Sequence, residues 1–245
     1  LSREVKKKFF SVCIDDFFLN PDEIREWGLS LDKGPSHDGA WPGERSDELY
    51  KINDVVNRHI IFKILSAYFD MSYVSFSWTH SNAYFQQIPK MSVNEGWVHK
   101  DISADTGAID LAGLIYLTPD ADPNGGTSLM RVKSEHENKI FNKNNPEKHL
   151  YYTGSQISDE DVTAALKRNN DKFYETVRFQ NIYNRLIIYD AQEYHRANNF
   201  DVGDSDRLTL VFFIGGINSD TLLPKERVVN KDFDATIESM IKLKT

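Results

Sequence analysis

Cysteine is nearly absent from this 245-residue chain, with Cys13 as its single representative. One thiol excludes an internal disulfide framework and a cysteine-based zinc cluster. Such a composition favours a reducing compartment, and we expect a cytoplasmic protein. Cys13 stands in a short β-branched and aromatic run, Phe9 to Ile14, with no histidine or basic residue beside it. We therefore expect a strand there and a buried, unreactive thiol.

Long apolar runs and an excess of basic residues are missing too. The longest apolar stretches, such as Leu208 to Ile217, fall well short of the roughly 18 residues that span a bilayer. The apolar run near the start of the chain ends at Asp15, too soon for a signal peptide. We expect no membrane partner. The 29 basic and 37 acidic residues give a formal net charge of −8, which argues against a nucleic-acid partner because phosphates require a basic face.

The remaining composition is that of a packed domain, with 40% hydrophobic and 12% aromatic residues. We expect one domain over 1–245. Its predicted parts are an N-terminal strand and support helices (1–72), a β core (73–215) with an insertion at 133–171, and a C-terminal tail ending in an amphipathic helix (216–245).

Two helices are predicted before residue 72. Asn20 followed by Pro21 is a strong helix start, and this helix should reach about Leu29. Ser46 can cap a second, longer helix with one apolar stripe. The stripe comprises Leu49, Ile52, Val56, Ile60 and Ile64. Its spacing predicts a helix packed against a sheet.

From residue 73 the pattern changes to short β-branched and aromatic segments separated by turn signals. These predict strands at Tyr73 to Gln87, Gly96 to Asp101, Leu111 to Thr118, Thr127 to Val132, Phe173 to Phe179, Leu186 to Tyr189 and Arg207 to Ile214. The polar insertion contains one predicted helix, capped by Ser158. Many strands after two helices indicate a mainly β fold with flanking helices (α+β), as a sandwich or jelly roll with the helices on one sheet.

The triplet His99-Lys100-Asp101 is the first candidate for chemistry. On a strand, positions i and i+2 share a face about 7 Å apart, so the imidazole and carboxylate can bind one metal ion while Lys100 points away. The alternative is a strand-end histidine followed by a turn-forming aspartate.

A site with two histidines and one carboxylate needs a distant second histidine, and it leaves three positions open on iron. His136 and His149 lie in the polar insertion, where we expect exposed loop residues. His195 follows the Leu186 to Tyr189 strand, on the β framework, and is the better candidate. Twelve residues later, Arg207 begins an apolar strand whose alternation places Arg207, Thr209 and Val211 on one face. A buried arginine needs a carboxylate, from an ion pair or from a dicarboxylate cosubstrate.

This ordered set resembles the Fe(II)/2-oxoglutarate dioxygenases, in their prolyl-hydroxylase-like branch. The residues that carry the resemblance are His99, Asp101, Tyr116, Gly125-Gly126, the strand ending at Tyr189, His195 and Arg207, within Tyr84 to Phe213. The resemblance implies a double-stranded β-helix (jelly-roll) core. It also implies Fe(II) bound by the two histidines and the aspartate, and 2-oxoglutarate bound by Arg207.

The same resemblance matches Tyr116 to a tyrosine that hydrogen-bonds the far carboxylate of 2-oxoglutarate, although a core strand tyrosine explains it equally well. Thr209 could add a hydroxyl to that carboxylate. Either Tyr84 or Gln86 could supply a further cosubstrate contact. The implied reaction uses dioxygen to hydroxylate a C–H bond of an amino-acid, peptidyl or small-metabolite substrate. The alternatives are a cupin-like metalloenzyme without 2-oxoglutarate and a non-catalytic jelly-roll binding module.

Overall fold

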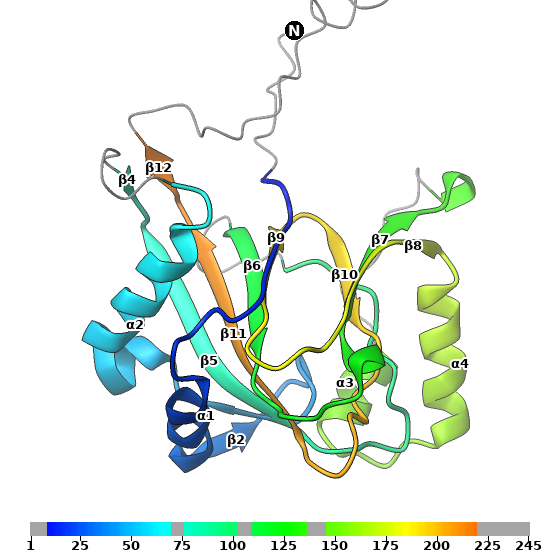
Figure 1. The fold of residues 1–245 in the computed structure, drawn as a ribbon. Coiled ribbons are helices and arrows are strands. Elements are labelled where there is room, and N and C mark those ends of the chain that lie inside the picture. The colour runs from blue at the N-terminus through cyan, green and yellow to red at the C-terminus, as the bar shows by residue number, and fades with distance from the viewer. Residues whose placement is uncertain (1–8, 70–75, 102–108, 137–145, 220–245) are drawn as a thin grey trace, which may run out of the picture.

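A computed structural model describes residues 9–69, 76–101, 109–136 and 146–219 (Figure 1). A seven-stranded antiparallel sheet has the strand order β1-β9-β6-β11-β5-β3-β2, and a three-stranded sheet has the order β10-β7-β8. A third, two-stranded sheet pairs β12 with β4. The two larger sheets lie on opposite sides of the molecule's centre in Figure 1.

The elements are short, as the turn signals predict. The strands are β1 (Val12–Ile14), β2 (Lys33–Pro35), β3 (Glu44–Ser46), β4 (Phe76–Ser77), β5 (His80–Ile88), β6 (Ile109–Tyr116), β7 (Thr127–Val132), β8 (Phe173–Phe179), β9 (Leu186–Asp190), β10 (Tyr194–Ala197), β11 (Arg207–Gly215) and β12 (Asn218–Ser219). The helices are α1 (Pro21–Ser30), α2 (Leu49–Leu65), α3 (Pro146–Tyr152) and α4 (Asp159–Asn170), with 3-10 turns η1 (Pro123–Gly125) and η2 (Ser134–His136). None of the helices in the described part of the chain is long and apolar enough to cross a membrane.

The connections between the sheets are those of a jelly roll. The chain passes from β5 and β6 in the large sheet to β7 and β8 in the small one, then to β9, β10 and β11 in alternation. Strand β11 inserts between β5 and β6, and it pairs with β5 over nine positions and with β6 over seven. Two sheets wound in this way form the double-stranded β-helix that the family resemblance implied.

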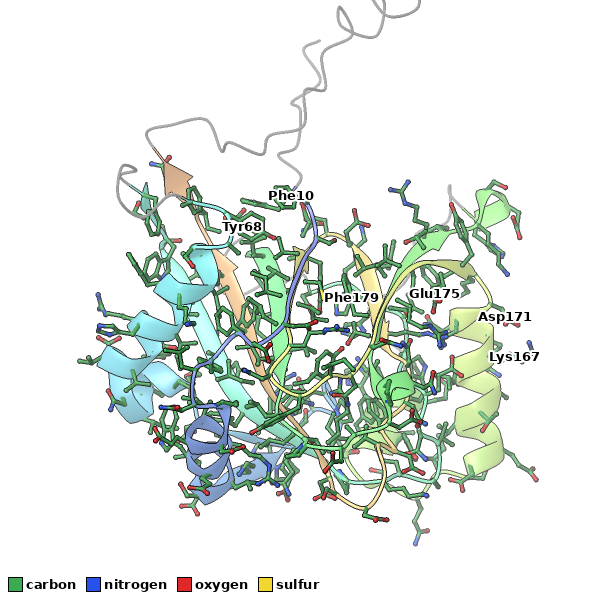
Figure 2. All side chains as sticks on the ribbon, viewed as in Figure 1. Phe10, Tyr68, Lys167, Asp171, Glu175 and Phe179 are labelled. Atoms are coloured by element: carbon green, nitrogen blue, oxygen red, sulfur yellow. The ribbon has the colours of Figure 1, made fainter. Side chains whose placement is uncertain are left out.

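Helices α1 and α2 pack on the outer face of the large sheet, which confirms the predicted placement. Trp27 of α1 meets Phe85 of β5 edge-on, with ring centroids 5.3 Å apart. Buried residues of α2 join the same core as Leu210 and Phe212 of β11. Just after α2, the Tyr68 hydroxyl donates a hydrogen bond to the carbonyl of Phe10 at 2.7 Å, which holds the start of the described chain against this core (Figure 2).

The start of α2 differs from the prediction. Ser46 does not cap the helix; it is the last residue of β3, and its hydroxyl accepts a hydrogen bond from the backbone of Phe85. The helix begins at Leu49 and is interrupted at Asn53, whose φ/ψ angles of −157° and 94° are not helical. The interruption shifts the apolar stripe, so Ile52 is 38% exposed whereas Ile60 and Ile64 are buried.

Four further predictions need correction or lie outside the described residues. Cys13 is exposed, because β1 is an edge strand paired only with β9 and alternate residues face outward. The predicted strand from Gly96 to Asp101 contains one bridge, at His99. The insertion holds two helices within its described residues, α3 as well as the predicted α4, whose cap Ser158 accepts from the amide of Asp161. The predicted C-terminal helix at Asp232 to Leu243 falls outside the described residues.

Close packing at the centre of the large sheet gives a stability prediction. A Cβ on Gly113 of β6 would lie 2.2 Å from the carbonyl oxygen of Ile187, whereas one on Gly34 of β2 would meet nothing within 4 Å. Gly113→Ala should therefore lower the free energy of unfolding by about 1–3 kcal/mol, the range for overpacked interiors. Urea denaturation measures this change. Gly34→Ala is the matched control, and equal stability of the two variants would contradict the packing argument.

Candidate metal centre

The inner faces of the seven-stranded and three-stranded sheets enclose a cavity of about 730 Å³. Its walls come from β5, β6 and β11 on one side, from β10 and the adjacent segment Gly96 to Asp101 on the other, and from α3. Cavities of this size are typical of small-molecule sites. His99, Asp101 and His195 all lie on its wall.

Backbone pairing brings the two histidines together. His99 and His195 exchange two hydrogen bonds, of 3.0 and 2.9 Å, so the segment carrying His99 runs antiparallel beside β10. Their ring centroids lie 4.4 Å apart. Asp101 follows two residues after His99, and the potential ligand atoms of the three side chains all lie within 4.8 Å of one another. The three residues that the sequence analysis selected therefore meet at one point.

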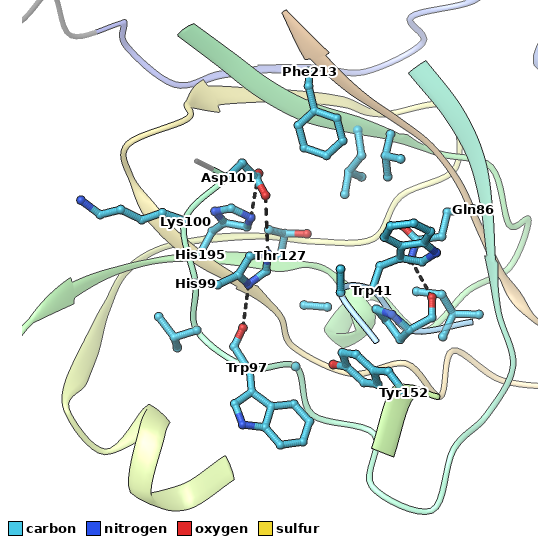
Figure 3. Close-up of a pocket in the computed structure, with 18 of the residues that line it drawn as sticks. Trp41, Gln86, Trp97, His99, Lys100, Asp101, Thr127, Tyr152, His195 and Phe213 are labelled. Carbon is cyan, nitrogen blue, oxygen red and sulfur yellow. Dashed lines mark hydrogen bonds and ion pairs between the residues drawn. The ribbon is translucent and has the colours of Figure 1, made fainter. Parts of the chain in front are cut away.

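Each imidazole is oriented by a backbone carbonyl. Nδ1 of His99 lies 2.8 Å from the carbonyl oxygen of Trp97, and Nδ1 of His195 lies 3.1 Å from that of Glu193. A carbonyl can only accept, so Nδ1 is the protonated nitrogen in the neutral form of each imidazole, and Nε2 is the atom that can bind a metal ion once any second proton has left. These Nε2 atoms lie 3.6 and 3.1 Å from the Asp101 carboxylate (Figure 3). Metal-binding histidines are usually held in this way.

The electrostatics of the three groups favour cation binding. Burial alone would raise the pKa of Asp101, but the facing imidazoles of His195 and His99 lower it to about 2. Burial and the adjacent His195 lower the pKa of His99. Burial would lower the pKa of His195 as well, but Asp101 raises it above its ordinary value. At neutral pH the Asp101 carboxylate is ionised and His99 is neutral. A divalent cation that binds the three groups therefore displaces at most one proton, which is the second proton of His195.

Helix α4 holds the segment that carries His99. The Asn170 side chain accepts from the amide of Val98 at 2.9 Å and donates to the carbonyl of Gly96 at 3.0 Å. Asn169 donates to the carbonyl of Val98 at 3.1 Å. Part of the insertion is therefore structural support for the metal centre. Lys100, as predicted, points away from the ligands, and its ammonium lies 4.4 Å from the Tyr194 ring centroid (Figure 3).

The two histidines of the insertion, His136 and His149, are not part of the candidate metal centre. His136 lies in the 3-10 turn η2, away from the cavity wall. His149 lies on α3, not in a loop, and it does line the cavity. Its Nδ1 hydrogen-bonds the carbonyl of Asp38, which fastens α3 to the loop after β2.

A buried cationic group lies on the large sheet at the same cavity. Arg207 is 3% exposed, and Nε donates to the carbonyl of Gly125 at 3.3 Å. Its Nη2 is buried and has no hydrogen-bond partner in the described part of the chain. Thr209, on the same face of β11, has a buried hydroxyl that likewise lacks a partner among those residues. The predicted alternation is confirmed, since Leu208 and Leu210 join the core on the other face.

Tyr116 and Gln86 flank this group. Tyr116 stands opposite Thr209 in the pairing of β6 with β11, and its ring centroid lies 5.5 Å from the Arg207 guanidinium carbon. Its hydroxyl donates to Thr127 at 2.9 Å. Gln86 stands opposite Thr209 on β5 and lines the cavity. Tyr84 instead donates to Glu48 at 3.2 Å.

Comparison with known sequences places the chain in a family. A family model described as "Family of unknown function (DUF6445)" matches residues 3–211, most of the chain. The chain belongs to this family. The description assigns the DUF6445 family no activity. No curated protein matches the sequence.

Solved structures give matches of low identity. HygX from Streptomyces hygroscopicus, with nickel, 2-oxoglutarate and hygromycin B bound, is 14% identical, with 84% of this chain and 83% of that chain covered and a TM-score of 0.49. A Pseudomonas putida prolyl-4-hydroxylase is 11% identical, with 84% and 91% covered and a TM-score of 0.44. A prolyl hydroxylase from Trichoplax adhaerens, in complex with a hypoxia inducible factor peptide fragment, is 12% identical, with 84% and 83% covered and a TM-score of 0.46.

The geometry of the three side chains predicts divalent-metal binding. Mn(II) should bind the purified DUF6445 protein with one ion per chain, and Asp101→Asn or His195→Ala should weaken binding at least about a hundredfold, because loss of even a supporting partner costs 10- to 100-fold. Calorimetric titration measures this. His59→Ala, at an exposed histidine on α2, is the matched control. Unchanged stoichiometry and affinity in both ligand variants would disprove the assignment.

Proposed function

We propose that this DUF6445 protein is an Fe(II)- and 2-oxoglutarate-dependent oxygenase that hydroxylates a C–H bond of its substrate. The observation that carries the proposal is the meeting, in one cavity, of a His-Asp-His ligand set with a buried arginine that has an unpartnered donor. The first group suits a metal ion with open positions, and the second suits a carboxylate.

His99, Asp101 and His195 fit iron in chemistry and in orientation. Two neutral imidazoles and one carboxylate are the donor set of non-haem Fe(II) oxygenases, which leave three positions for other ligands. Bound iron would supply dioxygen activation coupled to oxidation of 2-oxoglutarate to succinate and carbon dioxide. The chain itself keeps both imidazoles aligned through the carbonyls of Trp97 and Glu193.

Arg207 and Thr209 fit the far carboxylate of 2-oxoglutarate. Each has a buried polar atom without a partner among the described residues, and leaving such atoms unpaired costs about 1–3 kcal/mol apiece. A carboxylate would accept from both groups. Tyr116 contributes its ring beside the guanidinium. Its hydroxyl reaches Thr127, so we assign Tyr116 to the wall of the cosubstrate site.

Two other functions explain less of the structure. A cupin-like metalloenzyme without 2-oxoglutarate would use the three ligands but give no reason for the unpartnered atoms of Arg207 and Thr209. A non-catalytic jelly-roll module would need neither those atoms nor two imidazoles held with Nε2 toward one carboxylate. The oxygenase accounts for both groups at once.

The insertion is proposed to cover the primary substrate. Helix α3 places Lys148, His149 and Tyr152 on the cavity wall. Helix α4 lies outside the small sheet (Figure 1) and supports the segment before His99. Recognition of the substrate is therefore assigned to α3, and support of the metal centre to α4.

The cosubstrate assignment predicts the effect of changing Arg207. Arg207→Lys keeps the charge but removes the two-pronged donor, so 2-oxoglutarate should bind the Mn(II)-loaded protein more weakly by about one to three kcal/mol. Calorimetry measures the affinity. Arg131→Lys, at an exposed arginine of β7, is the control. Wild-type affinity in Arg207→Lys would show that the carboxylate binds elsewhere.

The proposed reaction predicts succinate. With Fe(II), dioxygen and 2-oxoglutarate, the wild-type protein should form succinate, and amino acids, peptides or metabolites that are substrates should raise its rate. Asp101→Ala should abolish this activity while circular dichroism shows an intact fold, because the side chain lies on the cavity wall and is not part of the hydrophobic core of the described residues. Absence of succinate from iron-loaded wild-type protein would refute the proposal.

The separate roles proposed for α3 and α4 predict that removing α3 impairs substrate recognition and spares the binding of metal and cosubstrate. Replacing the chain between Glu135 and Thr153 by a Gly-Ser bridge removes α3 but retains α4. Affinities for Mn(II) and 2-oxoglutarate should then stay within about twofold, since α4 and the ligand segment are kept. Stimulation of succinate formation by the substrate should be lost. Full stimulation would show that α3 takes no part in recognition.

A further inference from the structure

A second arginine lines the cavity, and nothing in the proposed reaction uses it. Arg45 lies on β3, and its guanidinium carbon is 4.5 Å from the ring centroid of Trp41 and 5.9 Å from that of Phe213. Stacking on aromatic faces leaves the edge of a guanidinium available for hydrogen bonds. Arg45 could not be recognised from the sequence, because β3 is three residues long and ends at Ser46, where a helix cap was predicted.

Arg45 is held in place but not neutralised. Its Nη2 donates to Oε1 of Gln86 at 3.0 Å, and Gln86 in turn donates to the carbonyl of Pro42 at 2.8 Å. Its Nε is buried and has no hydrogen-bond partner among the residues that the structure describes. Within the described residues Arg45 forms no ion pair, and burial lowers its pKa to about 10. A partly buried cation whose Nε is shielded from solvent is costly unless an anion meets it.

The charges around the cavity leave room for an anion. Asp101 is the only carboxylate among the described residues that line it, and it belongs to the metal centre. A divalent metal and Arg207 would be balanced by Asp101 and the two carboxylates of 2-oxoglutarate. Lys148 of α3 also lines the cavity; burial, opposed by Asp101 and reinforced by Arg45, lowers its pKa to about 8.

Arg45 is separate from the cosubstrate position. Thr209, Gln86 and Arg45 form one row across β11, β5 and β3, as the strand pairing shows. Two strand spacings put the backbone of Arg45 about 10 Å from that of Thr209. Figure 3 shows Trp41, Gln86 and Tyr152 across the cavity from the metal ligands His99 and Asp101. A molecule could therefore contact Arg45 and reach the metal centre while 2-oxoglutarate occupies Arg207.

We propose that the primary substrate is a small organic acid whose carboxylate binds Arg45 and whose apolar body packs between the aromatic side chains of the cavity. The planar guanidinium matches the two oxygens of one carboxylate. Trp41, Tyr152 and Phe213 provide the apolar walls. The cavity volume of about 730 Å³ suits a small molecule. This inference rests on the proposed function, because it assigns the substrate of the same site.

The proposal is tested by comparing the binding of small organic acids with the binding of their neutral amides. Phenylacetate, 3-phenylpropionate and hexanoate, each paired with its neutral amide, are titrated into the protein loaded with Mn(II) and saturating 2-oxoglutarate, and binding is followed by calorimetry. At least one acid should bind tenfold or more tightly than its amide, the scale of a charge-assisted hydrogen bond. In Arg45→Gln this preference should disappear. Arg58→Gln, at an arginine that is 71% exposed on α2, is the matched control.

The outcomes separate the two proposals. Binding of Mn(II) and 2-oxoglutarate is measured first in each protein, and its failure in the wild type counts against the oxygenase alone. The acid titration is then repeated on the metal-free protein. If no acid binds more tightly than its amide, or if Arg45→Gln keeps the preference, the organic-acid inference is wrong. Arg45→Lys, which retains the charge, is the second variant should Arg45→Gln fail to fold, and it should keep a reduced preference for the acid.

Discussion

The whole site depends on two backbone hydrogen bonds between His99 and His195. They attach the segment before Asp101 to the edge of the small sheet, so residues nearly a hundred positions apart present their imidazoles side by side. Because each Nδ1 faces a backbone carbonyl, the direction of both Nε2 atoms is fixed by the main chain. Because Asp101 stands two residues after His99, its carboxylate lies close to both Nε2 atoms.

The large sheet supplies the wall of the cavity that faces the candidate metal ligands. Its outer face is covered by α1 and α2, and this apolar packing fixes the register of β11 between β5 and β6. Alternation along β11 then requires Arg207 and Thr209 to face inward. The two buried donors without partners follow from that register, and a bound carboxylate would satisfy them. The cavity is thus chemically divided, with the proposed metal ligands beside the small sheet and the proposed carboxylate-binding groups on the large one.

Local pattern was enough to predict most strands, helix α1, the cap of α4 and the inward face of β11. Spacing alone made His99, Asp101 and His195 candidates, as a same-face pair and a distant histidine on the β framework, and the family resemblance then implied that they bind one metal ion. Local pattern failed where a short strand overrode local preference. Ser46 has the chemistry of a cap, but β3 pairs with β5 and uses its hydroxyl for the amide of Phe85. Cys13 is apolar enough for a core, but β1 is an edge strand.

The sequence by itself determined the periodicity of the strands and the order of the ligand and carboxylate-binding residues, since both are properties of neighbours along the chain. Only the tertiary structure decided that Asn169 and Asn170 support the segment before His99 and that Arg45 lies in the same cavity as Arg207. Those relations arise from pairing between distant strands and from docking of α4. One sequence pattern is compatible with many such pairings, and the packing of the complete core selects among them.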